Sequence, residues 1–175
     1  MKYNLFEKTN GQHYGLYVAS YEDEGICKIG VSTDAMDRFK ALQSYSWLNV
    51  SLEYFVFPFR EGHSFSQSDN FSILKASSFG LEKAVLDKAK ELGIHTRGEF
   101  IYAEPTDAVN FVKKVAKAEG YRLASPSDIL SLDMSNFSRA DDKAAFYEIA
   151  NAAGVAIEAM RYLADKKVDE SRKVI

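Results

Sequence analysis

The sequence predicts an α+β fold, in which helices flank a small antiparallel sheet and a helical extension follows at the C-terminus. Two short runs rich in aromatic and β-branched residues, 13–20 and 26–31, are joined by a turn that contains Gly25, which indicates a β-hairpin. A third such run covers 50–58. From residue 121 onward the pattern is nearly all helical.

The region after the hairpin predicts a helix and then a strand. Thr33 and Asp34 offer N-caps for a helix over 35–44. The strand over 50–58 alternates aromatic with apolar residues and has no polar face, so we expect helices to cover both of its sides. We expect its phenylalanines, and Trp47 before it, to lie in the core.

The middle of the chain predicts two further helices with a strand between them. Residues 59–77 are rich in Ser, Gly, Asn and Gln and predict a long loop. A helix over 78–92 then presents apolar residues at helical spacing and is closed by Gly93. A short strand over 99–103 precedes a helix that Thr106 caps and Gly120 ends.

The C-terminal part predicts a helical extension. We therefore divide the chain into a first domain over 1–120 and an extension over 121–175. Ser125-Pro126 opens a short helix, a long one runs from about 139 to 166, and 167–175 are expected to fray. Apolar residues of the long helix step by four and three residues. They are Phe146, Ala150, Ala153, Ile157, Met160 and Ala164. This 146–164 seam is expected to pack on the first domain, or to form a homodimer or bind a protein partner.

Composition excludes several classes of protein. The chain has 175 residues and a net charge of −3, so it cannot hold nucleic acid by bulk charge alone. Its single cysteine, Cys27, excludes a disulfide framework and is expected to be a small buried hydrophobe. No apolar run reaches the ~18 residues of a membrane helix, and no secretory leader is visible. We therefore expect a cytoplasmic protein without a membrane partner.

Several short motifs follow one another at characteristic spacing on the predicted elements. The hairpin carries two of them, the next helix carries an arginine, and a later helix carries a glutamate before the last strand opens. They are Gly15-Leu16-Tyr17, Lys28-Ile29-Gly30, Arg38, Glu82 and Gly98-Glu99-Phe100. Over residues 13–116 this order resembles the GIY-YIG endonuclease superfamily, and in particular its short phage and bacterial branch with a KIG second motif.

The resemblance implies a metal-dependent endonuclease that hydrolyses phosphodiester bonds in DNA, in a bacterial or phage-infected cell. Tyr17 would contact the attacking water, and Lys28 is the candidate cation that favours its phenolate. Arg38 would bind the non-bridging phosphate oxygens, which suit a planar guanidinium. Glu82 would hold one Mg²⁺ or Mn²⁺ ion, because such ions prefer oxygen ligands.

Two departures from the family pattern leave an alternative open. Lys28 stands where the second tyrosine is usual, and Leu42 stands one turn after the arginine, where His or Tyr is frequent. A catalytically silent GIY-YIG-like module that binds nucleic acid or a protein partner is therefore the second hypothesis, and a module whose function lies in the 146–164 seam is the third. The acidity predicts weak nucleic-acid binding by the monomer.

Overall fold

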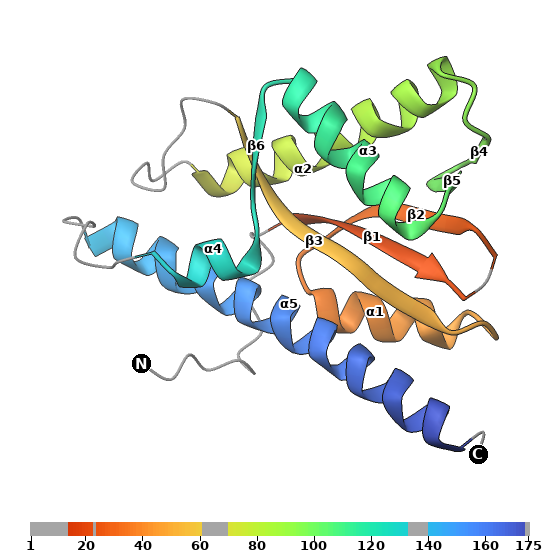
Figure 1. Ribbon diagram of the computed structural model, residues 1–175. Coiled ribbons are helices and arrows are strands. Elements are labelled where there is room, and N and C mark those ends of the chain that lie inside the picture. The colour runs from red at the N-terminus through yellow and green to blue at the C-terminus, as the bar shows by residue number, and fades with distance from the viewer. Residues whose placement is uncertain (1–13, 23, 61–69, 133–139, 174–175) are drawn as a thin grey trace.

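The computed structural model describes residues 14–22, 24–60, 70–132 and 140–173, and has an α+β architecture (Figure 1). Its six strands form one open antiparallel sheet in the order β4-β5-β2-β1-β3-β6. The strands are β1 (Gly15–Tyr21), β2 (Ile26–Ser32), β3 (Val50–Arg60), β4 (Thr96–Arg97), β5 (Phe100–Tyr102) and β6 (Tyr121–Ala124). The helices are α1 (Ala35–Ser44), α2 (Asn70–Glu91), α3 (Pro105–Ala118), α4 (Pro126–Leu130) and α5 (Ala140–Lys173).

The predicted hairpin is confirmed, and its register positions the candidate site. Gly25 adopts a φ of 58°, a conformation in which glycine carries no steric penalty. Tyr17 of β1 pairs with Gly30 of β2 on one side and with Phe55 of β3 on the other. β5 pairs with β2 only over Ile26 to Lys28. Next to this pairing, the Ile29 N–H donates to the Glu99 carbonyl at 2.9 Å, so the residue before β5 continues along this edge of β2.

The sheet has helices on both faces, and each face has its own core. α1 and α5 cover one face, with Phe55, Phe57 and Phe59 buried beneath them. α2 and α3 cover the other face, where Val56 is buried (Figure 1). The expectation that both sides of this strand are covered is thus confirmed. Trp47 was expected in the core, and this was wrong, because it follows α1 and lies 92% exposed.

Two segments differ from the sequence-based prediction. The predicted loop over 59–77 is wrong at both ends, since β3 continues to Arg60 and α2 already begins at Asn70, while 61–69 lie outside the described residues. Serines and asparagines are weak helix formers, so the first turns of this helix were missed, yet Ser78 is buried and donates a hydrogen bond to the Tyr14 carbonyl at 3.0 Å. The second difference is a pair of short strands that were not predicted, β6 beside the end of β3 and β4 beside β5. The expected cap Thr106 was also wrong, because the N-cap of α3 is Glu104.

The C-terminal part packs against the rest of the chain. The predicted short helix α4 is confirmed and has a capping box between Ser125 and Asp128. Along α5, Phe146, Ala150 and Ala153 are buried in the core beneath α1, so this half of the seam is used within the chain. α5 continues to Lys173, past the expected fraying point. Within the described residues, no helix is long and apolar enough to cross a membrane.

Candidate active site

Tyr17 lies at the centre of the candidate site and is almost fully buried, with 2% of its side chain surface exposed. Its ring lies over Gly30, where a Cβ would overlap the ring and the hydroxyl oxygen. The glycine of the second motif is therefore needed for space. Burial raises the pKa of the Tyr17 phenol well above its ordinary value, and the Arg38 charge opposes this shift.

Arg38 lies on α1, one turn after the helix begins. Asp34 caps this helix by accepting a hydrogen bond from the Asp37 N–H at 2.9 Å, and the Arg38 N–H donates to the Asp34 carbonyl. Arg38 is exposed to solvent, and its positive charge lowers the pKa of Tyr17. The guanidinium is thus close to the phenol and open to a ligand.

Lys28 lies on β2 and has a different neighbour from the one expected. Its Nζ is 2.5 Å from Glu99 Oε2 and 5.2 Å from the centre of the Phe100 ring. The Arg38 charge acts on Tyr17, and the Lys28 charge acts on the carboxyl groups. The expected action of Lys28 on the Tyr17 phenolate therefore stays a prediction, and the ion pair with Glu99 is the contact that the structure shows for this lysine.

Glu82 reaches the same site from α2, although this helix packs on the opposite face of the sheet. Burial raises the pKa of its carboxyl group, the negative charge of Glu99 raises it further, and the Lys28 charge lowers it. Glu82 and Glu99 in turn both raise the pKa of Tyr17. All four residues named from the sequence are thus electrostatically coupled with one another or through Glu99.

The residues present fit one hard divalent cation. The described residues hold no group of three or more His, Cys, Asp or Glu side chains of the kind that encloses a metal. Mg²⁺ keeps several of its waters and needs only one or two carboxylates. Glu82 is a half-buried carboxylate with a second carboxylate near it, and a pair of like charges of this kind gains from a shared cation.

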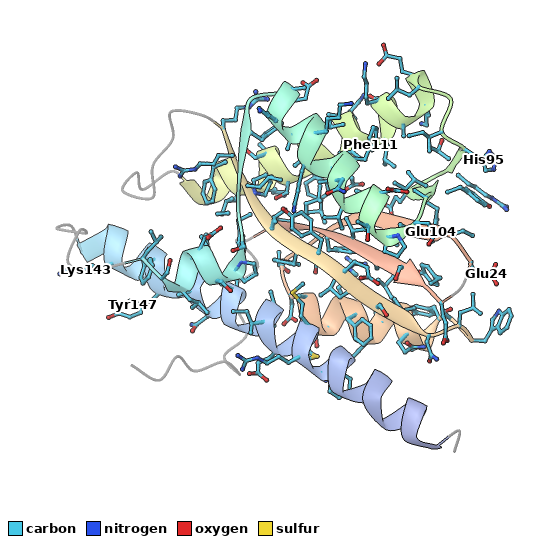
Figure 2. The ribbon with its side chains drawn as sticks, in the orientation of Figure 1. Glu24, His95, Glu104, Phe111, Lys143 and Tyr147 are labelled. Carbon is cyan, nitrogen blue, oxygen red and sulfur yellow. The ribbon has the colours of Figure 1, made fainter. Side chains whose placement is uncertain are left out.

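Sequence reasoning missed Glu99 as a site residue, although its Gly98-Glu99-Phe100 motif had been singled out. Its pairing with Lys28 depends on β5 lying beside β2, which no local pattern predicts. Cys27 is buried as expected, and burial raises its pKa to about 11. His95 lies at the β4 side of the sheet, its ring 4.5 Å from that of Tyr102 (Figure 2). His13 and His63 lie outside the described residues.

A groove opens beside the site, between α1 and the β2–β5 pair, with a volume of about 450 Å³. Lys28 and Arg38 contribute two positive charges to its lining, and Tyr21, Tyr45 and Trp47 contribute aromatic rings. Leu42, at the position where the family often has His or Tyr, also lines it and packs against the core. The groove therefore combines cations with aromatic surface next to Tyr17.

We compared the chain with models of protein families, with curated proteins and with solved structures, and none of the three comparisons finds a match. The residues of the site and their arrangement are therefore the basis for the function proposed below.

Proposed function

We propose that this protein is a metal-dependent endonuclease with a GIY-YIG-like fold, which hydrolyses phosphodiester bonds in DNA in the cytoplasm of a bacterial or phage-infected cell. One observation carries the proposal. Tyr17, Lys28, Arg38 and Glu82 come from β1, β2, α1 and α2, and their charges act on one another directly or through Glu99. Residues with perturbed pKa values that gather from several elements are typical of functional sites.

Each chain residue has a role that its surroundings support. The exposed guanidinium of Arg38 binds the non-bridging oxygens of the phosphate and neutralises charge that develops there. Burial keeps the Tyr17 phenol protonated at neutral pH, so its oxygen accepts a hydrogen bond from the attacking water and orients it. The Arg38 charge favours any proton transfer away from that phenol.

The carboxyl groups would hold the metal. Glu82, with Glu99 beside it, would bind one Mg²⁺ or Mn²⁺ ion, while Lys28 keeps Glu99 in position through their ion pair. When bound, such an ion stabilises the negative charge of the leaving oxygen. The weak overall charge of −3 is compatible with this chemistry, because a bound cation together with Lys28 and Arg38 would attract the phosphate without bulk positive charge.

A catalytically silent module that binds nucleic acid or a protein partner is the second candidate function. It is favoured by the burial of Tyr17, whose hydroxyl is protected from solvent, and by Leu42 in place of a second polar group. A homodimer or partner contact would use the outer half of the 146–164 seam, where Ile157 and Met160 are partly exposed.

A plasmid nicking assay with Mg²⁺ or Mn²⁺ tests the proposal. Tyr17→Phe, Arg38→Ala and Glu82→Gln each remove one group and are expected to slow cleavage by about 10²- to 10⁴-fold. Matched controls lie elsewhere: Tyr54→Phe on the opposite face and Glu91→Gln on α2 change the same residue types, and Lys40→Ala removes another cation of α1. Circular dichroism establishes that every variant is folded.

The outcomes separate the two candidate functions. Cleavage that persists in all three site variants at the rate of the controls overturns the nuclease. If the unmodified protein does not cut, but Arg38→Ala weakens its binding to DNA, the silent binding module is supported instead.

A further inference from the structure

Two aromatic residues beside the candidate site are held in solvent. Tyr45 and Trp47 lie on the segment between α1 and β3, and 91% and 92% of their side chain surfaces are exposed. They are the most exposed large hydrophobic side chains in the described part of the chain. Rings of this size normally bury most of their surface, so a pair left open next to a site indicates a binding surface.

The segment that carries these rings is braced. The Gln43 side chain amide donates to the Leu48 carbonyl at 3.0 Å, and its oxygen accepts from the Val50 N–H at 2.9 Å. The Tyr45 N–H also donates to the Ala41 carbonyl at the end of α1. The backbone between α1 and β3 is therefore tied at both ends, and the rings are presented from a preorganised support.

The same groove holds both rings and both cations. Tyr45 and Trp47 line it together with Lys28 and Arg38, and its volume is about 450 Å³. A ligand that fills this groove needs a negatively charged group to pair with the two cations and a flat apolar group to cover the aromatic rings. A nucleotide of an unpaired strand has this combination, because its phosphate is anionic and its base has a π-face free to stack.

A paired duplex fits the groove less well. Its bases are already stacked within the helix, so the rings at Tyr45 and Trp47 could not reach a base face. The net charge of −3 also supplies no general attraction for duplex phosphates. Stacking therefore provides binding free energy that the overall charge of the protein does not.

We propose that Tyr45 and Trp47 stack on an unpaired base next to the phosphate held by Arg38, so that the substrate is a single strand or a site with unpaired nucleotides. This inference rests on the proposed nuclease function for the position of the cut, but the stacking itself has an independent readout. Trp47 is the only tryptophan of the chain, so its fluorescence reports directly on this surface.

The test is a fluorescence titration of the full chain in EDTA, where no metal-dependent cleavage takes place. The probes are a short oligo(dT), an abasic oligonucleotide with the same number of phosphates, and a blunt duplex. Stacking predicts saturable quenching of Trp47 by oligo(dT), with much weaker quenching by the other two probes. Equal quenching by the abasic strand, or none by oligo(dT), overturns the proposal.

Variants sharpen the test through the anisotropy of a labelled oligo(dT). Tyr45→Ala and Trp47→Ala are each expected to weaken binding roughly 5- to 150-fold, and Trp47→Phe to retain most of it. Tyr162→Ala, an exposed tyrosine on α5 outside the groove lining, is the matched control and is expected to bind normally. Loss in the control equal to that in the groove variants contradicts the assignment.

Failure of the stacking and failure of the nuclease are distinguishable. Saturable quenching by oligo(dT) in a protein that never cuts DNA supports the stacking surface and overturns only the nuclease. Cleavage of a fully paired duplex at a rate that Trp47→Ala leaves unchanged overturns the stacking surface, while the nuclease stands.

Discussion

Two carboxylates on α2 lie a little over one turn apart and have opposite surroundings. Asp87 is exposed, and its hydrogen bond with Lys83 on the same helix lowers its pKa. Glu82 is half-buried, and burial together with the Glu99 charge raises its pKa. Asp87 is therefore stabilised in its charged form, whereas the charged form of Glu82 carries a free-energy cost.

The two grooves beside these residues show the same contrast. The groove between α2 and α3 is the larger, with a volume of about 830 Å³, and Phe111, labelled on α3 in Figure 2, lines it. Its charges pair locally, as Lys88 does with Glu91 at 2.7 Å. The groove at α1 is smaller, but its two charges, Lys28 and Arg38, come from two separate elements, β2 and α1. Convergence of charge across the fold, rather than size, indicates where chemistry takes place.

The largest effect is expected from exchanging the two carboxylates for amides. Glu82→Gln removes the proposed metal ligand and is expected to slow DNA cleavage by at least about 10²-fold, while Asp87→Asn leaves the rate within about twofold. Initial rates of plasmid nicking at saturating Mg²⁺ measure both. Similar losses in the two variants would remove the distinction between them.

The next largest effect concerns two glycines, Gly30 beneath the Tyr17 ring and Gly80 in the lining of the α2–α3 groove. The Cβ of Gly30→Ala would overlap the Tyr17 ring, so we expect a loss of about 1–3 kcal/mol in the free energy of unfolding and a severe loss of cleavage. Gly80→Ala on α2 places its Cβ 2.8 Å from Tyr121 Oη but gains helix propensity, so cleavage is expected to be unchanged. Urea unfolding and nicking rates test the pair. Normal cleavage by Gly30→Ala would show that Tyr17 need not be held in place.

A smaller effect is expected when one local side chain interaction is removed at each groove, the hydrogen bonds of Gln43 or the ion pair of Lys88. Gln43→Ala leaves the Leu48 carbonyl and the Val50 N–H without their side chain partner and should cost about 1 kcal/mol, or roughly 2–4 °C in Tm. Lys88→Ala breaks only an exposed ion pair and should cost less than about 0.5 kcal/mol. Calorimetry of both variants provides the measurement, and the reverse order would contradict the brace.

The smallest effect is a difference in how thermal stability depends on pH. The raised pKa of Glu82 means that its protonated form favours folding, and this contribution is lost as the pH rises through the folded pKa. Glu82→Gln is therefore expected to raise Tm at pH 7 and to lose this advantage below the ordinary glutamate pKa. The lowered pKa of Asp87 acts in the opposite sense, so Asp87→Asn should lower Tm slightly at pH 7. Melting curves at several pH values decide whether the signs differ.

Local patterns were sufficient for much of the fold. The hairpin, the helix over 35–44 and the buried strand were predicted because alternation, capping residues and apolar spacing act between near neighbours. Patterns of this kind are weak in short or polar segments. β6 has only four residues, and the first turns of α2 are rich in serine and asparagine, so both were missed although tertiary contacts stabilise them.

The candidate site was predictable in part. Tyr17, Lys28, Arg38 and Glu82 could be named from spacing and resemblance. Their partners could not, because the Lys28–Glu99 ion pair joins residues 71 positions apart. The prediction for Trp47 failed for a different reason. Its hydrophobicity predicts burial, but its ring is exposed at the groove beside the site, where Gln43 holds the segment through a hydrogen bond to the Leu48 carbonyl.

By itself, the sequence determined the types of helix and strand over most of the chain. It also determined the glycine that the hairpin turn requires, the glycine beneath Tyr17, and which kinds of side chain are available at the candidate site. Those features follow from backbone sterics and from periodicity within one element. Only the tertiary structure decided that Glu99 joins Lys28, that the Arg38 charge acts on Tyr17, and that Tyr45 and Trp47 border the cations. Electrostatic coupling and groove shape depend on distances between elements, and chain packing sets those distances.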